Sequence, residues 1–241
     1  MKIHHSPAYC LLLFLFLLIS CGEEPPPPPS NERPTTDTSD QELPFDEQNA
    51  ADLDELLKQY NPPGRDVWQK PEKVIDKMGD LQEKVVADLG AGSGDFFTFR
   101  LAQHAKKVIA LEIDQQLIDL IDSAKLVQLK PEYQGRLETR LVTPNDSKLS
   151  PGEADIILIV NTFIYIKDRI NYLKHLWDVL PEGGQIIIVD FKKKRIPIKN
   201  PKQRFRVELF KVENELYQAG FNVKESDDCS LDYQYIVVAE K

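Results

Sequence analysis

The sequence predicts an α/β fold built around one mainly parallel β-sheet. From about residue 84 onward, short apolar segments alternate with longer amphipathic ones, which is typical of strands alternating with helices. The segments 156–160 and 186–189 are unbroken apolar runs, as expected for strands that are buried on both faces. Helices must then cover both sides of the sheet. We expect residues 50–241 to form this single domain.

The elements follow one another in a regular order. Leu53, Leu56 and Leu57 share one face of a helix expected at 50–60, and Pro71 opens a second helix that ends at Gly79. After that, strands are expected at 84–88, 108–113, 137–142, 156–160 and 185–191, and helices at 96–104, 117–129 and 169–180.

The C-terminal part departs from this alternation. A helix is expected at 206–219, with Gly220 as its cap. Two strands, at 222–225 and 234–239, then follow with only a loop between them. Because a parallel crossover needs a longer connection, these two strands must pair antiparallel. One antiparallel strand therefore joins an otherwise parallel sheet.

Composition excludes several functional classes. The chain carries 30 Lys and Arg residues against 39 Asp and Glu residues, a net charge of −9, so we expect no nucleic acid as a partner. Its three cysteines, Cys10, Cys21 and Cys229, have no zinc-binding spacing, and two of its four histidines lie at the extreme N-terminus. We therefore expect no metal site, and we expect Cys229 to be a small buried apolar residue.

The N-terminus has the pattern of an export signal. Lys2 precedes the apolar run Leu11–Ile19, which is shorter than the roughly 20 residues that span a bilayer but suits a signal peptide. The sequence Leu18-Ile19-Ser20-Cys21 resembles the lipobox of bacterial lipoproteins. The resemblance implies a signal peptide at 1–20 and a lipid on Cys21. The alternatives are a false start codon and a poor membrane anchor.

A composition break separates this signal from the domain. Residues 21–49 contain five consecutive prolines, Pro25–Pro29, with few apolar residues, and we expect a disordered tether there. Glu23 and Glu24 resemble the acidic pair that directs some lipoproteins to the outer surface. We therefore expect a lipid-anchored protein of the bacterial cell envelope, with the outer membrane favoured.

The sharpest local feature is a glycine loop between an expected strand and the helix that follows it. It reads Gly90-Ala91-Gly92-Ser93-Gly94 and is bracketed by Asp88 and Asp95. Such a turn is where a nucleotide-like ligand meets the backbone of an α/β sheet. A dinucleotide fingerprint would place its third glycine at Asp95, and carboxylates there would repel a pyrophosphate. They suit a ligand with an ammonium and a sulfonium, such as S-adenosylmethionine. Glu112 can accept both ribose hydroxyls in either case.

These motifs resemble the class I S-adenosylmethionine-dependent methyltransferases from about residue 65 to 241. The resemblance rests on 86–94, on 109–114, on 143–146, on 154–161 and on 180–191. It implies a Rossmann-like, doubly wound seven-stranded sheet of order 3-2-1-4-5-7-6, with S-adenosyl-L-methionine as cofactor. The cofactor-binding residues that it implies are Arg65, Asp88, Gly90, Ala91, Gly92, Gly94, Glu112, Asn145, Asp146 and Asn161.

The part of the sequence expected to bind the methyl acceptor is less informative. A subset of the family that shares Arg65-x-x-Trp68-Gln69 often has paired histidines after the fourth strand, where this chain has Ile164-Tyr165. No catalytic residue can be named, and we expect Tyr165 to pack or to shape the pocket. Lys192-Lys-Lys-Arg195 begins a basic cluster that is either a contact for an acidic substrate or lipid headgroup, or simply a solvated loop.

Three functions are compatible with these features. The first is a membrane-tethered methyltransferase whose methyl acceptor is unknown. The second is an exported, non-catalytic protein that binds S-adenosylmethionine or S-adenosylhomocysteine on the same fold. The third is a nucleotide-dependent oxidoreductase. Export and cofactor stand in tension, because S-adenosylmethionine is made in the cytosol.

Overall fold

The computed structural model describes residues 64–241, all of which belong to one compact unit. Its strands form one seven-stranded sheet of order β3-β2-β1-β4-β5-β7-β6. They are β1 (Val85–Leu89), β2 (Lys107–Glu112), β3 (Leu137–Leu141), β4 (Ile156–Val160), β5 (Gln185–Phe191), β6 (Asn222–Asp227) and β7 (Gln234–Glu240). Only β7 runs antiparallel, against both β5 and β6. The predicted fold class and sheet order are confirmed.

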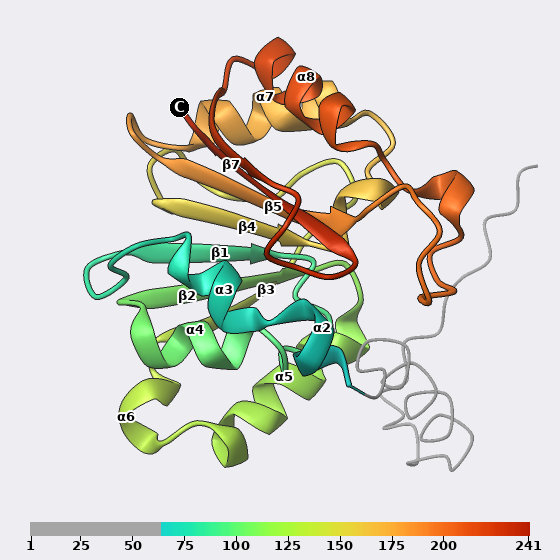
Figure 1. Cartoon of the computed structure of the whole chain (residues 1–241). Coiled ribbons are helices and arrows are strands. Elements are labelled where there is room, and N and C mark those ends of the chain that lie inside the picture. The colour runs from blue at the N-terminus through green and yellow to red at the C-terminus, as the bar shows by residue number, and fades with distance from the viewer. Residues whose placement is uncertain (1–63) are drawn as a thin grey trace, which may run out of the picture. The chain divides into compact units, whose positions relative to one another are not determined.

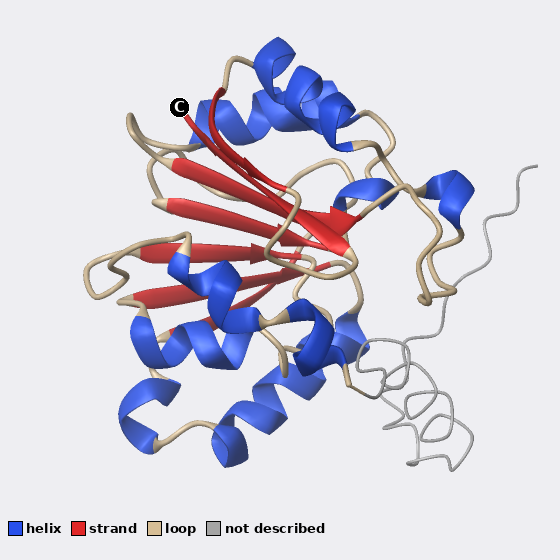
Figure 2. Cartoon of the chain, in the orientation of Figure 1, coloured by secondary structure: helices blue, strands red, loops and turns tan. Residues whose placement is uncertain are grey.

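Helices cover both faces of this sheet (Figures 1 and 2). They are α2 (Arg65–Gln69), α3 (Pro71–Asp76), α4 (Thr98–His104), α5 (Gln115–Gln128), α6 (Pro131–Gln134), α7 (Arg169–Val179) and α8 (Leu209–Ala219), with short 3-10 helices η1 (Phe163–Tyr165) and η2 (Gln203–Phe205). Helices α7 and α8 lie above the sheet in Figure 1, and α4 and α5 lie below it. The expected helix at 50–60, the signal peptide and the tether fall outside the described residues.

The apolar strands divide their side chains between two cores. On β4, Ile157 and Ile159 pack in the core that contains the buried residues of α7 and α8. Ile156 and Leu158 point the other way, into the core that α3, α4 and α5 help to form. Successive strand residues face opposite sides, so a continuous apolar run fills both cores. Because both faces of these strands are buried, polar side chains that could contact a ligand lie at the ends of the strands.

The structure differs from the sequence-based expectation at the end of β5. The helix expected at 206–219 begins only at Leu209, and η2 precedes it. Arg206 is buried instead, and its guanidinium donates to backbone oxygens of the preceding loop, including that of Ile198 at 2.7 Å. Helices α2 and α6 were not predicted as separate elements.

The expectation that Cys229 is buried is wrong. Cys229 is exposed, in the turn between β6 and β7. The Asp227 carboxylate accepts hydrogen bonds from the backbone N–H groups of Cys229 and Ser230 at 2.9 and 2.8 Å. These bonds hold the turn, which leaves the thiol on the outside.

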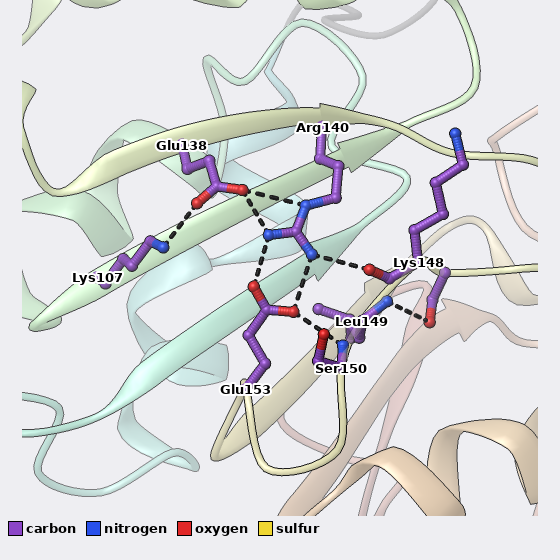
Figure 3. A network of polar contacts seen from close by, with 8 residues as sticks. Lys107, Glu138, Arg140, Lys148, Leu149, Ser150 and Glu153 are labelled. Carbon is purple, nitrogen blue, oxygen red and sulfur yellow. Dashed lines mark hydrogen bonds and ion pairs between the residues drawn. The ribbon is translucent and has the colours of Figure 1, made fainter.

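An arginine on β3 orders the connection from β3 to β4 (Figure 3). The Arg140 guanidinium donates to the Glu153 carboxylate at 2.9 and 2.6 Å, to the backbone oxygen of Lys148 at 2.9 Å, and to Glu138. Glu153 also accepts from the N–H of Ser150 at 2.9 Å. The network fixes residues 148–153 of this connection, which also carries Asn145 and Asp146. Among residues 64–241, no helix is both long and apolar enough to cross a membrane.

Candidate functional site

The glycine loop lies at the carboxyl end of β1 and closes over β2. Gly90, Gly92 and Gly94 have φ values of 80°, 60° and 76°, which side chains rarely tolerate. The backbone N–H groups of Gly90 and Ala91 both donate to the Leu111 oxygen, at 2.8 and 3.2 Å. A Cβ atom at Gly90 would clash with the Thr162 side chain. The predicted loop residues are therefore held together as one turn.

Glu112 joins this loop to the end of β2. Its Oε2 accepts a hydrogen bond from the Gly92 N–H at 2.9 Å, and its Oε1 accepts from the N–H groups of Ile113 at 2.7 Å and Asp114 at 3.3 Å. The side chain is buried, and burial raises the pKa of its carboxyl, although these three N–H groups oppose the rise. An acceptor is thus fixed beside the loop, where it can receive hydroxyl donors.

Asp88 lies beneath the loop, near the carboxyl end of β1. Its Oδ2 accepts from the Thr98 hydroxyl at 2.6 Å, and the side chain is buried. Burial raises the pKa of Asp88 to about 6; the Thr98 hydrogen bond and the charge of Arg65 oppose this rise, and the charge of Glu112 adds to it. A cationic group of a ligand beside Asp88 would stabilise the ionised carboxylate and lower its pKa again.

Arg65, on α2, lies close enough to the loop to interact electrostatically with Asp88 and Asp95. Its Nε donates to Gln69 Oε1, and its guanidinium lies 4.1 Å from the centroid of the Phe96 ring. Burial lowers the pKa of Arg65 to about 10, and the charges of Asp88 and Asp95 oppose the change. The guanidinium therefore remains a cation at neutral pH, close to the acids that bracket the loop.

The segment after β3 begins beside Glu112, since the Val142 N–H donates to the Glu112 backbone oxygen at 2.8 Å. Asn145 and Asp146 then lie exposed on a tight turn. Asp146 Oδ1 accepts from the Lys148 N–H at 2.8 Å and lies 3.6 Å from His175 Nε2. The turn lies beyond the carboxyl end of β3, next to the end of β2 that carries Glu112, and the contacts of Asp146 are with its own connection and with His175 on α7.

Asn161 follows β4, and its hydrogen bonds are with β5 and β7. It has a left-handed backbone, with φ 57°, and its N–H donates to the Val189 oxygen at 2.9 Å. Its side-chain oxygen accepts from Gln234 Nε2, at the start of β7. The next residue, Thr162, is the one that packs over Gly90. Asn161 therefore links the loop region to β5 and β7.

Three buried polar groups were not predicted as site residues. Asp190, near the end of β5, is fully buried, and its Oδ1 accepts from the Phe191 N–H at 2.7 Å. Within residues 64–241, Asp190 Oδ2, Gln234 Oε1 and Gln69 Nε2 have no hydrogen-bond partner. Such groups are costly to bury, and burial raises the pKa of Asp190 to about 7. In the sequence, Asp190 is an acid near the end of an apolar run, within the segment 180–191 that resembles the family.

Tyr165 does not pack as expected. Its side chain is 70% exposed at the end of η1, because this short helix turns the ring outward while Phe163 takes the buried position. Desolvation and the charge of Asp190 raise the pKa of Tyr165. It therefore stays protonated near neutral pH.

A separate surface hollow lies at the amino ends of the strands. Asp76, Asp80, His104, Tyr133 and Arg136 contribute to its walls. In doubly wound sheets, ligands bind beyond the carboxyl ends of the strands. The hollow is thus on the wrong edge for the chemistry of the glycine loop.

The residues at the carboxyl edge fit S-adenosylmethionine. Asp88 and Glu112 supply acceptors for an ammonium and for ribose hydroxyls, and Arg65 supplies a fork of donors for a carboxylate. The unpaired Gln69 Nε2 adds a donor to the same α2 segment. A pyrophosphate would instead meet two buried carboxylates, which disfavours a dinucleotide.

Known structures share this fold. A S-adenosylmethionine-dependent methyltransferase from Aquifex aeolicus superposes with a TM-score of 0.67 at 23% identity, covering 81% of this chain and 98% of the other. A possible exported protein from Bordetella parapertussis superposes with a TM-score of 0.57 at 13% identity, covering 72% and 67%.

Sequence relatives agree with the fold. The demethylmenaquinone methyltransferase of Lactococcus lactis is 24% identical over 152 residues, which is 62% of this chain and 58% of that protein. The chain spans about half the length of the curated relatives that it matches. The model of the ubiE/COQ5 methyltransferase family matches residues 63–235. The chain therefore belongs to the ubiE/COQ5 methyltransferase family, and S-adenosylmethionine is its cofactor.

Proposed function

We propose that this protein transfers a methyl group from S-adenosylmethionine to an acceptor in the bacterial cell envelope, where a lipid on Cys21 anchors it. The observation that carries the enzymatic part is the joined arrangement of the glycine loop, Asp88 and Glu112 in a chain of this family. The envelope location is supported by the lipobox-like Leu18–Cys21 segment and the proline-rich residues after it.

In this proposal the chain's residues position and desolvate the reactants. The cofactor, when bound, supplies an already activated methyl group on a sulfonium. Glu112 and Arg65 would hold and orient it beside the glycine loop, and Asp88 would balance the charge of its ammonium. Positioning of this kind is a large part of catalysis when the leaving group is already good.

The acceptor side is assigned to the ends of β4, β5 and β7. The side chains of Asn161 and Gln234 are hydrogen-bonded there, and Asp190 lies near the end of the neighbouring strand β5. Asp190 Oδ2 and Gln234 Oε1 have no hydrogen-bond partner among the described residues. Burial brings the pKa of Asp190 to about 7, which suits a group that accepts a proton near neutral pH. We assign to Asp190 Oδ2 the role of receiving or hydrogen-bonding the acceptor's proton.

The other two hypotheses, a non-catalytic binding protein and an oxidoreductase, are less well supported. A non-catalytic binding protein would not need a buried, unpaired acid at the acceptor side, and the family match favours an enzyme. The oxidoreductase is not retained, because the family's cofactor is S-adenosylmethionine. Export is compatible with this fold, since the protein from Bordetella parapertussis with the same fold is described as a possible exported protein.

The test uses the full chain and methyl-labelled S-adenosylmethionine with envelope extracts of the native host. Transfer of label by the wild-type chain, and its loss in Glu112→Ala, supports the proposal. Tight cofactor binding without label transfer to any extract fraction would leave the non-catalytic alternative as the correct one. Mass spectrometry of the native protein tests the anchor separately: an unacylated chain that keeps Met1 would contradict it.

A further inference from the structure

One segment is strongly basic, although the chain as a whole is acidic. Residues 192–206 contain eight Lys and Arg residues and no Asp or Glu, in a chain whose net charge is −9. We call this segment the basic loop. It joins β5 to α8, and in Figure 1 it is the orange segment that extends away from the carboxyl ends of the parallel strands.

The basic loop is folded, not merely charged. The buried Arg206 guanidinium donates to the backbone oxygens of Ile198 at 2.7 Å, Pro201 at 2.9 Å and Lys194 at 3.1 Å. The ammonium of Lys192 donates inward to the Leu231 oxygen at 2.9 Å. Two of the eight cations, Lys192 and Arg206, thus fix the backbone of the basic loop. The fixed backbone holds the other six in a defined arrangement.

Most of the displayed cations have no internal counter-charge. Lys193 pairs with Glu208 at 3.0 Å. The remaining five are exposed and form no ion pair with a carboxylate of the described residues: Lys194, Arg195, Lys199, Lys202 and Arg204. Gathering five like charges is unfavourable unless an anionic partner compensates them.

Exposed aromatic rings identify the kind of partner. Phe205 is 57% exposed, and the Arg204 guanidinium lies 4.7 Å from its ring centroid. Phe210, at the start of α8, is 56% exposed. Cations beside exposed aromatic rings match the interface of an anionic bilayer, where the rings enter the headgroup region and the cations meet phosphates. An acidic polymer without apolar groups, such as poly-glutamate, would give no such benefit to exposed Phe rings.

We propose that the basic loop docks onto an anionic lipid surface, independently of methyl transfer and of any lipid on Cys21. Each Lys or Arg near such a surface contributes about a fivefold increase in affinity. Neutralising three of the five cations should therefore weaken binding on the order of 100-fold. Phe205 should add a contribution that salt does not screen.

The experiment measures vesicle co-sedimentation of the full chain carrying Cys21→Ser. The vesicles are phosphatidylcholine alone, or phosphatidylcholine mixed with phosphatidylglycerol. The test variant is Lys194→Gln with Arg195→Gln and Lys199→Gln. The matched control is Lys73→Gln with Lys130→Gln and Lys174→Gln, which removes the same charge from exposed lysines on other elements. Phe205→Ser is measured separately, and thermal unfolding checks that each variant is folded.

We expect extra binding to the phosphatidylglycerol vesicles, lost in the test variant, kept in the control and reduced by Phe205→Ser even at high salt. Equal loss in test and control variants would overturn the proposal, because total charge would then explain it. Soluble poly-glutamate that binds as tightly as the vesicles, with no effect of Phe205→Ser, would mean an acidic macromolecule instead. Absence of any phosphatidylglycerol-dependent binding would also overturn it.

Discussion

The Oε2 atom of Glu112 accepts a 2.9 Å hydrogen bond from the backbone N–H of Gly92. One carboxylate at the end of β2 thus supports the glycine loop while standing where the family resemblance places a ribose contact. Loop order and cofactor affinity are therefore coupled through this side chain. Its other oxygen is engaged by the N–H groups of Ile113 and Asp114.

Glu112→Gln should weaken S-adenosylmethionine binding by about 1.5–3 kcal/mol, the size of lost charge-assisted hydrogen bonds. The glutamine side chain can accept only through its oxygen. Its NH2 group would therefore face backbone N–H groups that a carboxylate oxygen of Glu112 now accepts from. Isothermal calorimetry measures the effect, with Glu132→Gln on α6 as an exposed control. Unchanged affinity in Glu112→Gln would show that the carboxylate only supports the loop.

Asp88→Asn should separate stability from binding. The raised pKa of Asp88, about 6, means that the folded state prefers the protonated acid. The free energy of unfolding of the wild type should therefore fall as pH rises from about 4 to about 6. The variant lacks this decrease, so its relative stability should improve by on the order of 1–3 kcal/mol across the same range.

Binding should show the opposite trend for the same residue. Wild-type affinity for S-adenosylmethionine should increase as pH rises through about 6, since the ammonium favours the ionised acid. Asp88→Asn should bind weakly at every pH. Urea titrations and calorimetry over this range check both statements, and a variant with wild-type affinity would contradict the role of Asp88.

Asp190→Asn should lower kcat on the order of 10²-fold and leave cofactor affinity unchanged, because we assign Asp190 to the acceptor side of the site. The wild-type kcat should also fall below about pH 7, where Asp190 becomes protonated, and the variant should lose this limb. Tyr165→Phe is the control and should keep full turnover. A pH profile that is identical in Asp190→Asn and wild type would refute the assignment.

Glu153→Gln should destabilise the protein at neutral pH by about 1 kcal/mol, as expected for one member of a partly exposed ion-pair network. The Arg140 guanidinium lowers the pKa of Glu153 to about 2. The stabilisation is therefore present above the ordinary carboxyl pKa and is lost as pH falls toward 2. Unfolding curves should converge with the wild type at low pH; a constant difference would rule out this ionic origin.

The sequence predicted the parts of the fold that local patterns determine. Runs such as Ile156–Val160 identify buried strands, and the Gly90–Gly94 spacing identifies the loop, because in both cases neighbouring residues carry the signal. The antiparallel β7 followed from the short connection after β6. Helix α8 was predicted three residues too early, since Arg206 binds loop carbonyl groups instead of continuing a helix.

The acceptor side could not be predicted in this way. Asp190 and Gln234 are 44 positions apart, and they come to lie on neighbouring strands only because β7 pairs antiparallel with β5, with Tyr235 opposite Asp190 and Gln234 opposite Phe191. The bond from Gln234 to Asn161 crosses from β7 to the end of β4. Cys229 was misjudged for the same reason: turn contacts made by Asp227, and not local hydropathy, decide that its thiol is exposed.

The most direct test is calorimetric titration of the full chain, carrying Cys21→Ser, with S-adenosylmethionine, S-adenosylhomocysteine and NAD. We predict that the first two bind at a single site, that NAD does not bind, and that Glu112→Ala and Gly92→Val abolish or strongly weaken binding while Glu132→Gln does not. Binding of NAD alone, or no binding of S-adenosylmethionine by a chain that unfolds cooperatively, would contradict the account.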